Sequence, residues 1–438
     1  MLSRLFTVIS LLIASLLIAS LALFIFFITS TGQPHSQDDA VAKIYFADNI
    51  SAAHGNLIAR FNEQYRGRIE IVPVNLPFAK FSTNERKQLL TRSFRSKTTR
   101  VDIFAVDLVW VPRFVKWAEP LSDYFPAKES SHFLPYALES CYFENKLVGI
   151  PFYIDIGLMY YRADLLRKLP DSEEIEKKLK GSISWEEFIQ LGKRPELASY
   201  PFYLFPADNF EGLICCFAEA VNSPLISIEK QNAIDLNRAQ TRRGLQLLVD
   251  LVNRYRLTPR VVTEYKEVDV YQYALERDAV FFRGWPGNLR PYANAYPEKV
   301  GSLGMAALPH FENTSSSSVF GGWNLMISKE SEKKAEALEF LKFVSSKDVQ
   351  QMFYKEAGYL PTNRTVYEDA AFLAANPELQ YLHSLLERGM HRPSLVEYTK
   401  ISDILSSYIS RAIKQEMPVE AALLGAQEMI RSQKVLIN

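Results

Sequence analysis

The sequence predicts a mixed α/β body that is divided into two lobes. Segments typical of strands and of helices alternate along most of the chain, and this pattern indicates parallel strands joined by helices that cover both faces of a sheet. The roughly 400 residues that follow an apolar N-terminal segment are too many for one hydrophobic core of the usual size. We therefore expect two α/β lobes with a crevice between them.

The apolar N-terminal segment predicts export. Residues 5–28 contain no charge, and about 24 residues span roughly 36 Å as a helix, more than the roughly 30 Å of bilayer hydrocarbon. Arg4 precedes the segment and Asp38 and Asp39 follow it, so the positive-inside rule places the body outside the cytoplasm, in the periplasm or at the cell surface. We expect residues 1–30 to be a signal peptide or a signal-anchor helix, and residues 31–40 to be a polar tether.

The first half of the body alternates as a parallel sheet requires. Apolar residues at helical spacing predict a helix over 51–65, and Gly67 ends it. A basic helical segment is expected near 87–94. Extended segments are expected at 42–47, 68–75, 101–109 and 148–161.

The second half continues the pattern. Helices are expected at 184–193, 240–256, 265–277 and 331–357, the last ended by Gly358, and two more are expected between 395 and 430, split at Pro418. Strands are expected at 279–282, 300–308 and 319–328.

Charge balance and cysteine content exclude several classes of function. The chain has 50 Lys and Arg against 50 Asp and Glu, whereas a nucleic-acid binder needs an excess of cations to displace counterions from phosphates. Three cysteines are too few for a disulfide scaffold. We expect Cys141, Cys215 and Cys216 to be small buried apolar residues, although a bridge from Cys141 to one of the pair stays open.

Motifs of catalysis and metal binding are missing from the sequence. The six histidines show no ligand spacing such as H-E-x-x-H, and there is no G-x-S-x-G, P-loop or G-x-G-x-x-G. Asp102 and Asp107 lie in one predicted strand at an odd separation, so they point to opposite faces and do not form a catalytic pair. We expect no enzyme activity, no cofactor and no metal.

Some residues are candidates for ligand binding. Asp107 lies near the C-terminal end of a predicted parallel strand, where ligands bind in open α/β sheets. Tyr153 and Asp155 are two apart in an extended segment and point the same way. An aromatic ring beside a carboxylate suits a sugar. The alternatives are a structural carboxylate bonded to backbone N–H groups, a core tyrosine and a hinge aspartate.

Two tryptophans next to glycine turns are further candidates. Trp285 stands between Arg-Gly and Pro-Gly, and Trp323 follows Gly321 and Gly322. Glycine permits close backbone approach, and such positions favour a binding crevice over a core. Arg392 precedes a proline and is interpreted, from its local sequence alone, as a surface ion-pair partner.

An ordered series of short motifs runs from about Lys43 to the C-terminus. It comprises VDIFAVDLVW at 101–110, WAEPLSDY at 117–124, IPFYIDIGLMYYR at 150–162, FEGLI at 210–214, AVFFRGWP at 279–286, FGGWNLMIS at 320–328, GYLPT at 358–362 and HRP at 391–393. This series resembles the extracellular solute-binding proteins of ABC sugar importers. The resemblance is closest to their trehalose/maltose-binding branch.

The resemblance implies a two-lobed periplasmic-binding-protein fold of type II, like that of the maltose-binding protein. A hinge and an interlobe ligand cleft are expected, preceded by the N-terminal hydrophobic helix. The implied N-terminal lobe comprises residues 41–150 and 302–360. The implied C-terminal lobe comprises residues 151–301 and 361–438.

The resemblance also implies a function and a set of ligand-binding residues. A monomer would close on a disaccharide or related glycoside, such as trehalose, maltose or sucrose, and deliver it to a membrane permease. The ligand-binding positions carry over to Asp107, Tyr153, Asp155, Trp285, Gly321, Trp323, Arg392 and Arg95. Two departures leave the sugar open: the family's acidic residue is missing from 49–54, and Pro-Gly-Asn follows Trp285. An exported glycoside-acting enzyme and a sugar sensor that partners a membrane receptor are the alternatives.

Overall fold

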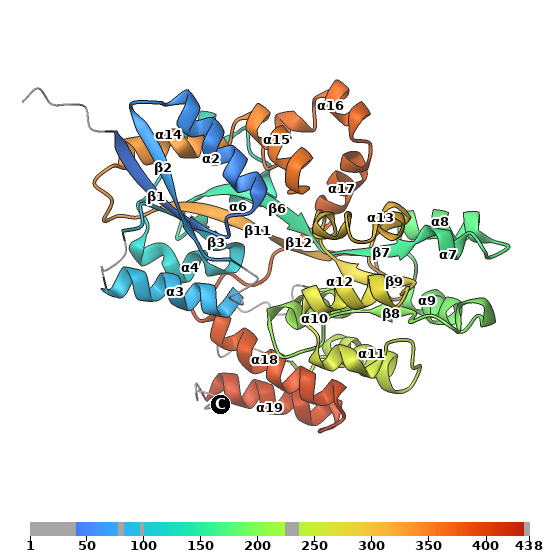
Figure 1. Ribbon diagram of the computed structural model, residues 1–438. Helices are drawn as coiled ribbons and strands as arrows, with labels where there is room; N and C mark the ends of the chain where they lie inside the picture. Colours follow the sequence, from blue (N-terminus) through green and yellow to red (C-terminus); the bar gives the residue numbers. More distant parts are fainter. Residues whose placement is uncertain (1–40, 78–82, 97–99, 224–235, 433–438) are drawn as a thin grey trace, which may run out of the picture.

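The computed structural model describes residues 41–77, 83–96, 100–223 and 236–432 (Figure 1). The predicted signal segment and tether lie outside the described residues. Among the described helices, none combines the length and the apolar character that crossing a bilayer requires.

The first sheet has six strands and mixed direction. These are β1 (Ala42–Asp48), β2 (Ile69–Asn75), β3 (Ile103–Asp107), β6 (Ile150–Ile156), β11 (Ser318–Ile327) and β12 (Gly389–Met390), in the order β12-β11-β3-β1-β2 with β6 paired to β11. β1 is parallel to β2 and β3, as expected, but β11 is antiparallel to β3 and β6. The prediction of a wholly parallel sheet is therefore wrong, because β11 returns from the other sheet without a helical crossover beside its neighbours.

The second sheet follows the first without a break in the chain. It contains β10 (Leu303–Ala306), β7 (Leu158–Arg162), β9 (Phe281–Gly284) and β8 (Tyr203–Leu204) in that order, and a separate hairpin joins β4 (Tyr142–Phe143) to β5 (Lys146–Leu147). β6 of the first sheet leads through Gly157 directly into β7 of the second. The extended segment predicted at 148–161 thus supplies one strand to each sheet.

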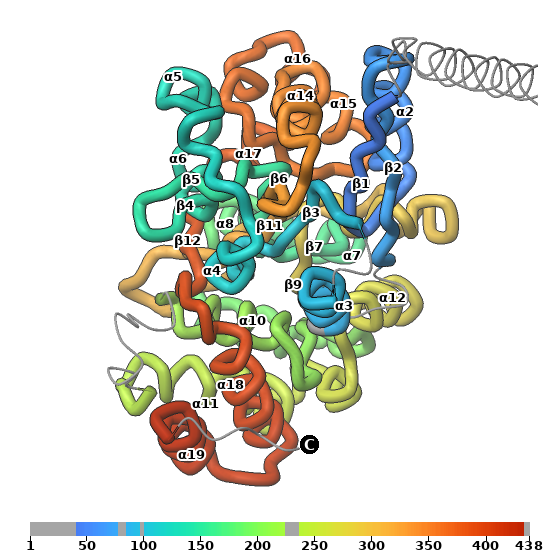
Figure 2. The backbone as a smooth tube through the Cα atoms, turned by 90° about the vertical axis from the view of Figure 1, so that its left-hand side faces the viewer, coloured from blue at the N-terminus to red at the C-terminus, as the bar shows by residue number. Residues whose placement is uncertain are grey.

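Helices cover both sheets. α2 (Ala52–Gln64), α14 (Lys334–Val344) and α15 (Lys347–Ala357) lie on one side of the first sheet, and α3 (Thr83–Ser96) and α4 (Val111–Phe114) lie on the other (Figures 1 and 2). The short helices α5 (Ala127–Ser130) and α6 (Pro135–Glu139) precede β4. The remaining helices are α7 (Ala163–Leu166), α8 (Ser172–Gly181), α9 (Trp185–Gly192), α10 (Glu211–Val221), α11 (Ala239–Asn253), α12 (Glu267–Glu276), α13 (Pro297–Gly301), α16 (Ala370–Ala375), α17 (Glu378–Leu386), α18 (Tyr398–Ile413) and α19 (Val419–Arg431).

One predicted helix is in fact two. The segment 331–357 breaks between α14 and α15 at Ser345 and Ser346. Ser346 has extended backbone angles, and its hydroxyl donates to the carbonyl of Phe343 at 2.7 Å. Serine side chains compete with the helix for backbone groups and so favour such breaks. Gly358 ends α15 in the left-handed conformation, as predicted.

Each sheet has its own hydrophobic core. One core gathers buried side chains between Ile44 and Tyr153 and between Trp323 and Phe353, and the other gathers most of its side chains between Ile154 and Phe320 and between Tyr354 and Ile430. This confirms the two-lobed α/β architecture, while the exact lobe limits stay a prediction. The three cysteines are free and buried, as expected.

Candidate functional site

Neighbouring strands of the first sheet bring five of the predicted residues together. β3 ends at Asp107, β6 carries Tyr153 and Asp155, and β11 runs between these strands. In the register of the sheet, Trp323 of β11 lies opposite Asp107 on one side and Tyr153 on the other, and Gly321 lies opposite Asp155. The residues therefore form adjacent rows across three strands, although they are far apart in sequence.

Arg392 joins this group through Asp107. Its Nη2 donates to Asp107 Oδ1 at 3.1 Å, and the residue is only 7% exposed. Asp107 Oδ1 also accepts from the backbone N–H of Val109 at 3.1 Å, so the structural carboxylate considered as an alternative is present as well. Burial raises the pKa of Asp107, although Arg392 opposes the rise. Arg392 is thus a buried ion-pair partner, and its interpretation as a surface residue is wrong.

Glu211 holds the other side of Arg392. This first residue of α10 accepts from Arg392 Nη1 at 2.6 Å and from the Tyr398 hydroxyl at 2.7 Å. Glu211 lies within the FEGLI motif at 210–214 but is not among the predicted ligand-binding residues. A buried arginine needs carboxylate partners. The need of Arg392 for an acidic partner is therefore the signal that could have identified Glu211.

Tyr153 and Asp155 lie in different surroundings. The Tyr153 ring stacks on Tyr359 with centroids 4.2 Å apart. Asp155 Oδ1 is buried and accepts no hydrogen bond from the described residues. Burial raises the pKa of Asp155 well above its usual value, because Arg283 compensates only part of the cost of the charge. Asp155 Oδ1 therefore lacks a hydrogen-bond donor within the part of the chain that the structure describes.

Trp285 of the second lobe meets the first sheet at Gly321. Its indole Nε1 donates to Glu267 Oε1 at 2.7 Å, and the Arg283 guanidinium lies 3.8 Å from its ring centroid. A Cβ atom on Gly321 would lie 2.8 Å from Trp285 Cζ3 and 3.2 Å from Asp155 Cβ. Only glycine permits this approach of the ring to the backbone, so Gly321 determines how closely Trp285 and Asp155 lie together.

Trp323 is backed by residues that the sequence analysis missed. Arg86 is fully buried, and its guanidinium carbon lies 4.3 Å from the Trp323 ring centroid. Arg86 Nη2 donates to Asp48 Oδ1 at 3.0 Å, and Asp48 Oδ2 lies 3.3 Å from His54 Nε2. The acid was expected at 49–54, and Asp48 lies one position before this range. Asp48 is the last residue of β1, so the strand-end rule that selected Asp107 would also have selected it.

Arg95 is the one predicted residue that the structure places apart. It lies exposed in the last turn of α3, the helix that carries Arg86. Arg95 follows Arg86 by nine positions, which is two and a half turns at 3.6 residues per turn, so the two side chains leave the helix on opposite faces. Arg86 is therefore an α3 cation that contacts the cluster, and the buried Lys87 of the same helix lies in the field of Asp107 and Glu211.

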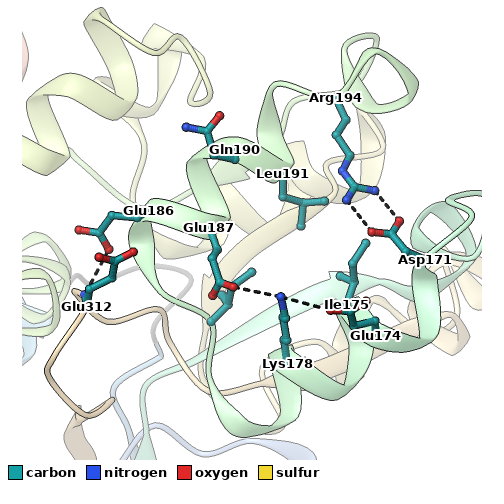
Figure 3. Close-up of a pocket in the computed structure, with 11 residues that line it drawn as sticks. Asp171, Glu174, Ile175, Lys178, Glu186, Glu187, Gln190, Leu191, Arg194 and Glu312 are labelled. Carbon is teal, nitrogen blue, oxygen red and sulfur yellow. Dashed lines mark hydrogen bonds and ion pairs between the residues drawn. The ribbon is translucent and has the colours of Figure 1, made fainter.

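One cavity lies beside this cluster, and another lies away from it. One of about 280 Å³ is lined by Arg392, Phe320, His391 and neighbours of Asp107. Another of about 380 Å³ lies between α8 and α9, where Lys178 pairs with Glu187 at 3.0 Å and Arg194 pairs with Asp171 at 2.6 Å (Figure 3). None of the predicted residues lines this second cavity. In the described part of the chain, no group of His, Cys, Asp and Glu side chains is arranged to hold a metal ion.

Comparison with known proteins agrees with the fold. The family model described as bacterial extracellular solute-binding protein matches residues 45–351. A probable ABC transporter-binding protein of Deinococcus radiodurans is 27% identical over 357 residues, which are 78% of this chain and 82% of that protein.

Solved structures give the same result. The maltose-bound structure of T. maritima MalE3 superposes with a TM-score of 0.78 at 26% identity, covering 90% of this chain and all of the other. The GacH receptor of Streptomyces glaucescens, solved unliganded and with acarbose, superposes with a TM-score of 0.75 at 19% identity over 90% of this chain and 98% of the other. These likenesses confirm the predicted maltose-binding-protein-like fold.

Proposed function

Because the chain belongs to the bacterial extracellular solute-binding proteins, we propose that it is the sugar-binding component of an ABC importer. Its ligand is a disaccharide or a related glycoside, of the trehalose, maltose or sucrose type. The ligand lies between the lobes, at the cluster formed by Asp107, Asp155, Arg392 and the two tryptophans. The bound protein then delivers it to a membrane permease.

Asp155 carries the proposal. Its Oδ1 is buried without a hydrogen bond from the described residues, and it lies beside Gly321, against which the Trp285 ring packs. Leaving a buried charged group unsatisfied costs about 1–3 kcal/mol or more. A polyhydroxylated ligand supplies the missing donors, and its apolar C–H face packs on the aromatic ring. An apolar ligand supplies neither.

The expected binding energy is consistent with a transport receptor. Sugar hydroxyls donate to Asp107 and Asp155, and Arg392 donates to sugar oxygens. Hydrogen bonds to charged groups contribute about 1.5–3 kcal/mol each. Three or four of them, with stacking on Trp285 and Trp323, reach the roughly −8 kcal/mol of a micromolar complex after ordering costs.

Closure of the lobes would couple binding to transport. A ligand that contacts residues of both lobes binds the closed arrangement better than the open one, and so shifts the population toward it. The permease then recognises the closed form. An uncleaved segment 1–30 would hold the receptor at the membrane surface, close to that permease.

Calorimetry with maltose, trehalose and sucrose tests the proposal. We expect at least one of them to bind with a micromolar dissociation constant and to be recovered unchanged. Asp155→Asn removes the acceptor charge and should abolish the binding heat. Asp171→Asn is the matched control, because Asp171 is paired with Arg194 in the cavity between α8 and α9 and should leave binding intact.

Two results would contradict the proposal. Folded protein that binds none of a broad panel of carbohydrates would exclude the sugar ligand. Hydrolysis of a disaccharide during incubation would instead indicate the glycoside-acting enzyme, which needs two carboxylates on either side of a glycosidic bond.

A further inference from the structure

Glu211 lies where the two lobes and the C-terminal helices meet. It is the first residue of α10, and its Oε1 accepts from Arg392 Nη1 at 2.6 Å and from the Tyr398 hydroxyl at 2.7 Å. Its Oε2 accepts from the hydroxyl of Ser402. Tyr398 and Ser402 both belong to α18, which packs on α10. Hydrogen bonds from α18 and from Arg392 therefore fix the Glu211 carboxylate at the start of α10.

Arg392 extends from this fixed carboxylate to the first sheet. Its Nη2 donates to Asp107 Oδ1 at 3.1 Å and to the carbonyl of Phe320 at 3.3 Å. A guanidinium group is planar and presents its donors in a rigid fork, so acceptors on both sides fix its orientation. Asp107 ends β3 in the first sheet, whereas Glu211 begins a helix whose side chains belong to the second core. The three side chains thus form a bridge between the lobes.

The negative charge of Glu211 at the start of a helix explains why this residue is the fixed end of the bridge. The N-terminus of a helix favours a negative charge, and Glu211 occupies the first position of α10. Asp107 accepts from fewer donors than Glu211, whereas both carboxylates are partly exposed, with 14% of the Asp107 side chain and 19% of the Glu211 side chain accessible. When a ligand takes up part of the Asp107 hydrogen bonding, the bond to Glu211 keeps Arg392 at the site.

We propose that Glu211 is a positioning residue: it holds Arg392 for the ligand and, through Arg392, fastens the second lobe to Asp107 of the first. The part of this inference that concerns the ligand rests on the proposed function. The part that concerns the lobes does not, and it is tested without any ligand.

Glu211→Gln in the full-length chain is the informative variant. Glutamine keeps the shape of the side chain, an acceptor for Tyr398 and a donor for Ser402, and removes only the charge that pairs with Arg392. A hydrogen bond to a charged group is worth roughly a tenfold change in affinity or more, so calorimetry with maltose, trehalose and sucrose should show about tenfold weaker binding. In an Arg392→Met background, Glu211→Gln should weaken binding no further.

The ligand-free measurement uses energy transfer between the lobes. Dyes are attached at Arg66→Cys, after α2, and at Arg254→Cys, after α11, whose native side chains are 76% and 72% exposed. The native cysteines are buried and should not be labelled in the folded protein. Without sugar, Glu211→Gln should broaden the distribution of interlobe distances.

Glu378→Gln is the matched control. Glu378 also begins a helix, α17, and accepts from a tyrosine hydroxyl, that of Tyr354, at 2.6 Å. It should change neither affinity nor interlobe distance. Equal weakening by Glu211→Gln with and without Arg392 would reduce Glu211 to a structural role, and unchanged distances would overturn the bridge. If the unaltered protein binds none of a broad panel of carbohydrates, the proposed function fails, and the distance measurement still decides the bridge.

Discussion

Each lobe presents a tryptophan that is backed by an arginine, and each arginine is held by a buried carboxylate. In the first lobe Arg86 lies over Trp323 and bonds to Asp48. In the second lobe Arg283 lies over Trp285 and bonds to Glu219. A guanidinium over an aromatic face is attracted by the ring quadrupole, so each arginine holds one face of its ring. Both tryptophans are buried, with 7% of Trp323 and 9% of Trp285 exposed.

The two arginines differ in how well their charge is compensated. Arg283 makes a bidentate ion pair with Glu219, in which Nε and Nη2 lie 3.1 and 2.9 Å from the two carboxylate oxygens. A carboxylate oxygen of Glu267 lies 3.6 Å from Arg283 Nη1. Carboxylates accordingly raise the pKa of Arg283 above its usual value despite burial. Burial dominates at Arg86 and lowers its pKa, although Asp48 opposes this. The carboxylates around Arg283 therefore stabilise its charge more strongly than Asp48 stabilises the charge of Arg86.

Replacement of each arginine by methionine tests this difference with the largest expected effect. Arg283→Met leaves the buried Glu219 and the nearby Glu267 without their cation, and breaking a buried pair in this way costs about 3–5 kcal/mol. Arg86→Met should cost less than half as much, because Asp48 keeps a second polar neighbour, His54, whose Nε2 lies 3.3 Å from Asp48 Oδ2. Urea denaturation of both variants measures the two free energies of unfolding. Equal losses would show that the lobes use their arginines in the same way.

Asp155 lies beside Gly321, against which the Trp285 ring packs. Through this carboxyl group the stability of the protein should depend on pH with an unusual sign. Burial raises its folded pKa, so the folded state binds the proton more tightly than the unfolded state, and stability falls as pH rises above the usual carboxyl value of 3.8. Asp155→Asn should therefore be more stable than the unaltered protein at neutral pH, by about 1–3 kcal/mol. The difference should vanish below about pH 3, where the carboxyl is protonated in both states.

Unfolding free energies of the two proteins at neutral and at acidic pH provide the measurement. Asp102→Asn is a useful control, because Asp102 accepts from the Ser331 hydroxyl at 2.6 Å and from the Tyr45 N–H at 2.9 Å. That substitution should destabilise the protein at neutral pH. If Asp155→Asn also destabilises the protein at neutral pH, Asp155 has a partner that stabilises its charge.

The sequence predicts the strands, the helices and the candidate residues of both lobes better than the side chains that these residues contact. Periodicity and glycine positions predict most strands and helices, and the ordered motifs select the residues that meet across β3, β11 and β6. Strand direction was not predictable, because the antiparallel course of β11 depends on a return from the other lobe. The break at Ser345 and Ser346 interrupts an apolar stripe that continues through both helices.

The missed site residues share one cause. Asp48, Arg86 and Glu211 act through side chains that are distant in sequence, and a local pattern carries no information about such pairs. Arg95 shows the same limit: the sequence indicates a cation on this helix, but which arginine faces the sheet depends on the helical phase relative to β11. The strand-end position of Asp48 was the one local signal available.

Gly321→Ala should have the smallest effect on stability and still sharpen the comparison. The added Cβ would lie 2.8 Å from Trp285 Cζ3, and the rigid ring has to shift on its bond to Glu267 to relieve the contact. Such overpacking costs about 1 kcal/mol. The chain has five tryptophans, so their indole N–H resonances can be assigned. The Trp285 resonance should move and that of Trp323 should stay, because Trp323 packs on Trp110 and Arg86. Gly55→Ala, which meets nothing within 4 Å, should move neither; movement of both in Gly321→Ala would show that the two rings respond as one unit.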